Sequence, residues 1–295
     1  MGRKRILLLS IFFILFLPAV LVFSGGNQEK EPGEEKNVKI FVSILPQEYF
    51  VKRIGGDTVE VEALVPAGKS PHSYEPTPKQ VLALSGADIL FTIGVDFENA
   101  FIPEIGSTLP GLTIVNTRQG ISLRKMEGGH HGENDPHVWL GLEEAKVIGK
   151  NIRDSLTSLN PGGGTIYEKN YEAFTADINA LYNELSESLA PVKGRSFLVY
   201  HPSFGYFADT FGLYQESIET GGDEPTPKQM EKIVSRAHAE EIRVIFVQPQ
   251  FSQKSAETIA ESINGAVVPV NSLAPDWLGN LKDLAGAIRL GLIGE

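Results

Sequence analysis

Three histidines of this chain each stand beside a proline, and their spacing is nearly even. His72, His137 and His201 lie in the strings SPHSYEPTP, DPHVWL and VYHPSFGYF, 65 and 64 residues apart. Proline fixes its own φ and disfavours helix in the residue before it, so we expect each histidine in a loop of defined shape. Three converging imidazoles are enough to bind zinc. Spacing alone also allows three separate loop histidines that bond to backbone.

The elements around these histidines follow a strand–loop–helix alternation. Apolar or alternating runs predict strands at 39–44, 58–64, 87–93, 112–116, 196–200, 213–218, 244–248 and 266–271. Amphipathic runs predict helices at 78–85, 142–159, 167–189, 228–239, 255–263 and 278–292. This alternation is typical of an α/β fold with parallel sheets and flanking helices. Ligands of parallel sheets gather at the carboxyl ends of strands, which is where connections of this kind lie.

Two such α/β lobes are expected, joined by one long helix. The hexamer EPTPKQ occurs at 75–80 and again at 224–229, which indicates two related lobes. We predict an N-terminal lobe over 38–163, a linking helix over 164–191 and a C-terminal lobe over 192–295. A rigid linking helix would limit how far the lobes can close.

The N-terminus is typical of an export signal. A basic start, Arg3 to Arg5, is followed by an almost wholly apolar stretch to Phe23 and then by small residues. We predict a signal peptide over 1–24, with an uncleaved anchor as the alternative, and a solvated tether over 25–37. The protein would then be periplasmic or otherwise extracytoplasmic. A lipoprotein would need a cysteine at the cleavage site, and the chain contains none.

Composition excludes several classes of function. Without cysteine there is no disulfide framework, no thiolate metal ligand and no cysteine nucleophile, so a transition-metal site must use imidazole and oxygen. The formal net charge is −11, with no basic cluster beyond the predicted export signal. Phosphate binding needs concentrated Lys and Arg, and we therefore expect no nucleic-acid partner.

Several motifs together resemble one known family, the zinc- and manganese-binding solute-binding proteins of bacterial ABC importers, or TroA/ZnuA-like helical-backbone receptors. The resemblance covers nearly all of 38–295. Its motifs are SILPQEYFVKRIGGD at 43–57, PHSYEPTP at 71–78, ADILFTIG at 87–94, DPHVWL at 135–140, VYHPSFGYFADTFGL at 199–213, EPTPKQ at 224–229 and IFVQPQFS at 245–252.

The resemblance implies a receptor that binds a metal ion between two lobes and delivers it to the permease and ATPase of an importer. It places the first three ligands on His72, His137 and His201. Members with histidine at the third position resemble zinc receptors, whereas manganese receptors usually carry glutamate there. Neutral imidazoles suit Zn²⁺ and carboxylates suit Mn²⁺, so zinc is the expected cargo and manganese the second candidate.

At the fourth ligand position the chain departs from the family pattern. Many relatives carry aspartate there, and the aligned residue is Asn271; Gln248 likewise stands where relatives often have glutamate. An amide oxygen is a weaker zinc donor than a carboxylate. The first candidates for the fourth ligand are water and Asn271, followed by Glu75 and Asp276. If Asn271 is the ligand, Asn271→Asp should tighten zinc binding.

Two other functions would use the same residues or the same fold. A zinc hydrolase or hydratase also needs three histidines and a water, but the sequence has no HExxH pair and no evident general base. A surface adhesin is the other alternative. His130 and His131 lie in a glycine-rich loop, either as a weak secondary metal site or as part of a solvated loop. We expect no catalysed reaction.

Overall fold

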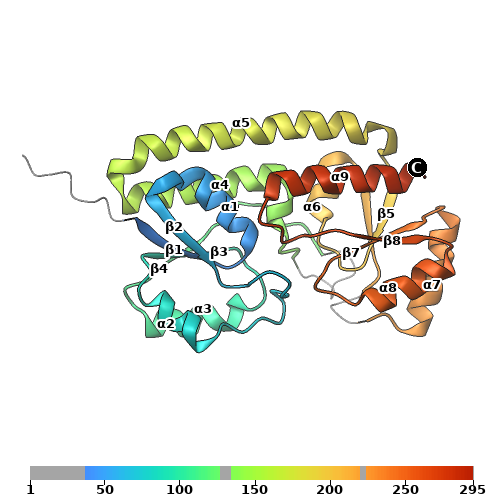
Figure 1. Cartoon of the computed structure of the whole chain (residues 1–295), viewed down its shortest axis with the longest axis horizontal. Coiled ribbons are helices and arrows are strands. Elements are labelled where there is room, and N and C mark those ends of the chain that lie inside the picture. Colours follow the sequence, from blue (N-terminus) through green and yellow to red (C-terminus); the bar gives the residue numbers. More distant parts are fainter. Residues whose placement is uncertain (1–36, 127–133, 220–223, 295) are drawn as a thin grey trace, which may run out of the picture. The chain divides into compact units, whose positions relative to one another are not determined.

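The described part of the chain holds two four-stranded parallel sheets of the same topology (Figure 1). A computed structural model describes residues 37–126, 134–219 and 224–294. The first sheet has the order β2-β1-β3-β4 and the second the order β6-β5-β7-β8. The strands are β1 Val38–Val42, β2 Val59–Ala63, β3 Ile89–Thr92, β4 Thr113–Asn116, β5 Ser196–Val199, β6 Tyr214–Ser217, β7 Val244–Val247 and β8 Ala266–Pro269. The predicted α/β fold class is confirmed.

Strand composition follows strand position. The central strands β3 (ILFT) and β7 (VIFV) are apolar and almost wholly buried, as expected where helices cover both faces of a parallel sheet. The edge strand β2 (VEVEA) alternates valine with exposed glutamate. Each strand's carboxyl end passes into a loop, and these loops carry the polar residues discussed below.

Nine α-helices surround the sheets in the described residues. They are α1 Leu45–Gly55, α2 Pro78–Leu84, α3 Glu98–Thr108, α4 Leu142–Leu159, α5 Gly164–Leu189, α6 Gly205–Phe211, α7 Pro227–Ala239, α8 Gln253–Ser262 and α9 Trp277–Ile293. Short 3-10 turns occur at Gly56–Thr58, Val138–Leu140, Pro161–Gly163 and Ala190–Val192.

Sequence patterns did not predict α1, α3 or α6. Helix α1 follows β1 closely, so its apolar start continues the strand's apolar run. Helix α3 contains Pro103. Helix α6 is short and buried on nearly every side, and it therefore shows no amphipathic period.

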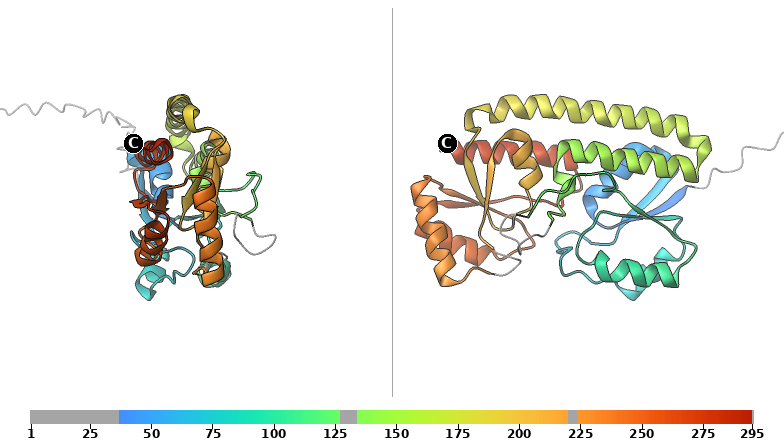
Figure 2. Two further views of the ribbon diagram at one scale, coloured as in Figure 1. Left: turned by 90° about the vertical axis from the view of Figure 1, so that its right-hand side faces the viewer. Right: turned by 180° about the vertical axis from the view of Figure 1, so that it is seen from behind.

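The longest helix, α5, runs along both sheets (Figures 1 and 2) and contacts α1, α4 and α9. One face is buried throughout its 26 residues. Phe174 on this face lies 5.7 Å from Phe50 of α1 and 6.3 Å from Trp277 of α9, measured between ring centroids. One aromatic cluster, formed by Phe50, Phe174 and Trp277, therefore joins a helix of the first half (α1), the long helix α5 and the last helix of the second half (α9).

The repeated hexamer EPTPKQ begins an equivalent helix in each half. Thr77 caps α2 and Thr226 caps α7, and in both cases the glutamine three residues later completes a capping box. Each helix follows the second strand of its half. The identical segments thus form the same capping box at the start of each helix.

The predicted signal peptide (1–24) lies outside the described residues, as does the tether (25–37) except for Asn37. His130 and His131 also lie outside them. Over the ranges given above, no helix has both the length and the apolar character that crossing a membrane requires.

Candidate metal centre

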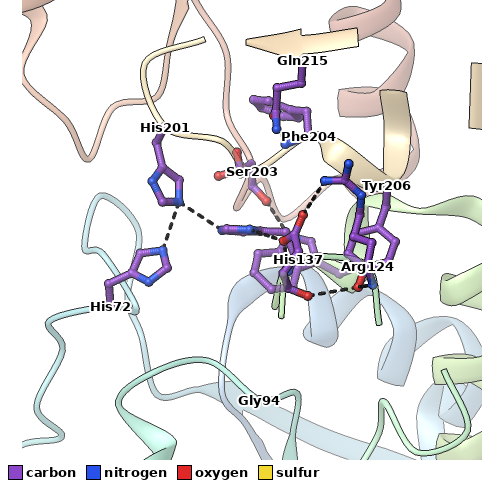
Figure 3. A network of polar contacts seen from close by, with 12 residues as sticks. His72, Gly94, Arg124, His137, His201, Ser203, Phe204, Tyr206 and Gln215 are labelled. Atoms are coloured by element: carbon purple, nitrogen blue, oxygen red, sulfur yellow. Dashed lines mark hydrogen bonds and ion pairs between the residues drawn. The ribbon is translucent and has the colours of Figure 1, made fainter. Parts of the chain in front are cut away.

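Three separate loops bring His72, His137 and His201 together (Figure 3). His72 lies in the loop after β2, His137 directly precedes the 3-10 turn Val138–Leu140, and His201 follows β5. The Nε2 atom of His201 lies 3.1 Å from Nε2 of His72 and 3.1 Å from Nε2 of His137. One ligand atom from each residue falls within 4.8 Å of the others. Three lone pairs therefore share one small volume, as metal binding requires.

Each imidazole uses its other nitrogen for a carboxylate. Nδ1 of His72 lies 2.6 Å from Asp96, and Nδ1 of His137 lies 2.8 Å from Asp135. Nδ1 of His201 hydrogen bonds to Glu219. A carboxylate accepts and cannot donate when ionised, so each ring carries its proton on Nδ1 and leaves Nε2 bare. Carboxylate–histidine pairs of this kind orient the ligands of metal sites.

The loop of His137 is fixed by a buried polar network. Asp135 also accepts a bond from the His137 backbone N–H at 2.9 Å and one from Arg124 Nη1 at 3.0 Å. Tyr206 donates its hydroxyl proton to the Asp135 carbonyl at 3.0 Å. Arg124 fits there because Gly205 has no side chain: a Cβ at Gly205 would lie 1.6 Å from Arg124 Nη1.

The loop of His201 is fixed by Gln248. The side-chain oxygen of Gln248 accepts from the His201 backbone N–H at 3.3 Å, and its nitrogen donates to the His201 carbonyl at 2.7 Å and to Ser203 at 2.8 Å. This arrangement needs a donor and an acceptor in one side chain. A glutamate could not make it in ionised form. Gln248 thus supports the backbone of the site through its amide.

Burial favours the neutral form of the two buried histidines, His137 and His201. Removal from water lowers the pKa of His137, partly offset by Asp135, and lowers the pKa of His201 well below its usual value, with repulsion from the other two rings adding to the effect. Burial by itself would raise the pKa of Asp135, but bonds from His137 and Arg124 hold it below the ordinary value. Neutral imidazoles beside ionised carboxylates are the state that binds a cation.

The cavity at the three rings is very small. It measures about 10 Å³ and is lined by Ser70, Pro71, His72, His137, Trp139, His201, Gln250, Phe251, Ser272 and Leu273. That volume is close to the smallest that accepts one water-sized particle. Phe251 stacks on His201 with centroids 4.5 Å apart, and Trp139 packs against His137 at 5.2 Å. Aromatic walls therefore leave room for a single small ion.

Asn271 is not among the residues that line this cavity. It lines a neighbouring cavity of about 280 Å³. Its side-chain oxygen accepts a bond from the Leu273 backbone N–H at 2.9 Å. The carboxylate of Asp276 accepts from Gly279 at the start of α9. Of the His, Cys, Asp and Glu side chains in the ranges described, only the three histidines form a metal-ligand group, so Glu75 and Asp276 do not join it. The ligand role of Asn271 stays a prediction.

Sequence reasoning did not find the three carboxylates or Phe251. The signal that could have found two of these acids is their place after predicted strands: Glu219 directly follows the strand at 213–218, and Asp96 is the third residue after the strand at 87–93. Asp135 stands two residues before His137, where its side chain can reach the ring. Of the aromatic residues close to the histidines in the sequence, Trp139 packs against the His137 ring, whereas Tyr74 packs against Phe97.

Similarity to known proteins identifies the family of this chain. The model of a protein family described as "ZnuA: Zinc-uptake complex component A periplasmic" matches residues 40–290. The chain belongs to this family. The manganese ABC transporter substrate-binding lipoprotein PsaA of Streptococcus pneumoniae is 28% identical over 275 residues, which cover 88% of this chain and 87% of that protein.

Solved structures of ZnuA resemble this chain in both fold and sequence. A crystal structure of ZnuA is 37% identical with a TM-score of 0.84, covering 87% of this chain and 100% of that one. A ZnuA deletion mutant with zinc bound is also 37% identical, with a TM-score of 0.83 and coverage of 87% and 98%. The predicted family is therefore confirmed.

Family membership makes the chain an extracytoplasmic, metal-binding solute receptor of an ABC importer. Such receptors bind and hand over their cargo, and the prediction that this chain is not an enzyme is confirmed on that ground. The hydrolase alternative falls with it. A three-histidine group is typical of zinc or manganese receptors, and the relatives' names include both metals.

Proposed function

We propose that the chain captures Zn²⁺ with Nε2 of His72, His137 and His201 and delivers it to the permease of an ABC importer. The observation that carries this proposal is the convergence of three imidazole nitrogens, each backed by a carboxylate, on a cavity of about 10 Å³. The zinc-bound ZnuA structure, 37% identical to this chain, supports the same metal.

The donor set favours zinc over manganese. Imidazole nitrogen suits Zn²⁺, whereas Mn²⁺ prefers carboxylate and water oxygens. The histidine cluster contains no carboxylate among the described residues. Zinc also accepts four ligands at short distances, which suits a cavity of this size. We propose water as the fourth ligand, since the Asn271 side chain lies in another cavity and bonds to Leu273.

The same proposal assigns the parts of the chain. Residues 38–163 would form the N-terminal lobe, 164–191 the linking helix and 192–295 the C-terminal lobe. His72 and His137 then belong to the first lobe and His201 to the second, so the metal would bridge them. Export through a signal peptide at 1–24 would place the receptor in the periplasm, beside the permease and ATPase.

Metal selectivity tests the proposal directly. Metal-free protein should bind one Zn²⁺ per chain and prefer it to Mn²⁺ in a competition titration with a fluorescent chelator. His201→Glu should reduce this preference by about tenfold or more, because one imidazole becomes a carboxylate oxygen. His238→Glu is the matched control, since His238 is exposed on α7. Tighter binding of Mn²⁺ by the unaltered protein would contradict the proposal.

A further inference from the structure

We propose that Asp96 is a positioning residue that holds His72 in place and thereby sets the rate at which the metal leaves. This inference rests on the proposed metal receptor function. Asp96 would not touch the metal. It would act through the Nδ1 atom of His72, 2.6 Å away.

The three carboxylate–histidine pairs differ sharply in exposure. In the pairs His137–Asp135 and His201–Glu219, every side chain is 5% exposed or less. In the third pair the His72 side chain is 26% exposed and the Asp96 side chain 55%. Solvent therefore reaches the metal site at His72, and exchange of the metal with solvent should begin there.

Each of the two buried histidine rings packs against an aromatic side chain outside the metal cluster, and within the described ranges the His72 ring has no such aromatic partner. Asp135 is itself bonded to Arg124, and His137 packs against Trp139. His201 stacks on Phe251, and Gln248 binds its backbone. For the His72 ring, the hydrogen-bond and aromatic-ring contacts within the described ranges are with Asp96 and the other two histidine rings. The His72 backbone N–H donates to Ser70 Oγ at 3.3 Å, so Asp96 is the hydrogen-bond partner that holds the ring itself from outside the metal cluster.

Asp96 lies in a turn that is stabilised by hydrogen bonds. It stands between the buried residues Val95 and Phe97, just before α3. The carboxylate of Glu98 accepts backbone N–H bonds from Ile93 at 2.9 Å and from Gly94 at 2.7 Å, which closes the turn. A fixed turn holds the Asp96 carboxylate at a fixed place.

The same turn contacts the loop that carries His72. The Phe97 backbone N–H donates to the Pro71 carbonyl at 3.4 Å, and the Phe97 ring lies edge-on to Tyr74 at 5.8 Å. The loop therefore rests on the turn on both sides of His72. Replacement of the exposed Asp96 side chain leaves these contacts in place and removes only the support of the ring.

Loss of this support should affect release more than capture. With Asp96, the His72 ring keeps its proton on Nδ1 and points Nε2 at the metal. Without it the ring can turn toward solvent, and the ion remains bound to His137 and His201 alone. A metal with two protein ligands dissociates faster. Among closely related complexes, most affinity differences lie in the dissociation rate.

The test measures zinc dissociation from the purified, zinc-loaded protein by stopped flow with excess EDTA. Asp96→Ala should weaken zinc binding by about 10–100-fold, mostly through faster dissociation. The zinc dissociation rate of Asp96→Asn should lie between the rates of the unaltered protein and of Asp96→Ala. The amide oxygen still accepts the hydrogen bond from Nδ1, but it carries no charge. Asp57→Asn, which makes the same change at an exposed site before β2, should match the unaltered protein.

A second measurement separates positioning from general damage. Histidine ¹⁵N NMR of the metal-free protein should show His72 protonated on Nδ1, and Asp96→Ala should lose this preference while the thermal midpoint stays unchanged. An Asp96→Ala dissociation rate within twofold of the unaltered protein overturns the inference. If instead the unaltered protein binds no zinc, the proposed function fails first, so the two failures are distinguishable.

Discussion

At the scale of single residues, the site divides the two nitrogens of each imidazole between two tasks. Nε2 faces the other rings, and Nδ1 faces Asp96, Asp135 or Glu219. The carboxylates bring negative charge close to the cation without entering its coordination. This offsets the absence of an acidic ligand within the histidine cluster. A neutral donor set can therefore bind a doubly charged ion in a largely buried cavity.

Asn271→Ala tests the fourth ligand at this scale. We expect zinc affinity to change by less than about threefold, because the Asn271 side chain bonds to Leu273 and lines a different cavity. Unfolding free energy should fall by about 1 kcal/mol through loss of that hydrogen bond. Competition titration and urea unfolding measure the two quantities. An affinity loss of tenfold or more would identify Asn271 as a ligand.

At the scale of elements, α5 stabilises the platform under the site without reaching the metal. Its buried face packs on α1, α4 and α9, and Phe174 lies in the aromatic cluster with Phe50 and Trp277. Trp277 in turn donates its indole N–H to the carbonyl of Trp139, two residues after His137. The helix packing thus continues into the backbone of the metal site.

Phe174→Ala should separate stability from binding. Removal of a fully buried phenylalanine costs about 3–5 kcal/mol of unfolding free energy. Zinc affinity should change by no more than a few-fold, since Phe174 packs in the aromatic cluster with Phe50 and Trp277 and not in the lining of the metal cavity. Ile166→Ala on the same helix is the control, because Ile166 is 51% exposed and should cost less than about 1 kcal/mol. Urea unfolding compares the variants; equal losses would contradict the assignment of the buried face.

At the scale of the whole molecule, two buried imidazoles link stability to pH. Burial lowers the pKa of His137 and His201 below the ordinary value of 6.5. As pH falls through that value, the unfolded chain takes up protons that the folded chain does not. The unfolded state is therefore stabilised, and the folded protein loses stability on the acid side.

Metal-free protein should accordingly be less stable at pH about 5.5 than at about 7.5, by on the order of 1 kcal/mol from His201. Urea unfolding at both pH values measures this difference. Histidine NMR provides the control, because the His201 ring should remain neutral at the lower pH while the protein is folded. Equal stability at the two pH values, with the His201 ring neutral, would refute the linkage.

The sequence by itself determined the strands, six of the nine helices of the described chain and the chemistry of the donors. Alternating and apolar runs predicted all eight strands of the described chain, and the repeated EPTPKQ indicated two similar halves. The absence of cysteine restricted the metal ligands to imidazole and oxygen. These properties can be predicted from the sequence because secondary structure depends mostly on residues close in the chain, and because donor chemistry depends on residue type.

Only the tertiary structure decided which atoms meet. His72 and His201 are 129 residues apart, yet their Nε2 atoms lie 3.1 Å from each other. The pairing of Asp96 with His72, the amide role of Gln248 and the position of Asn271 all depend on loops packed from separate strands. A shift of a loop by about one or two ångströms would be enough to change which side chains form a hydrogen bond. No local pattern in a sequence specifies distances of that size, since they result from the packing of the whole core.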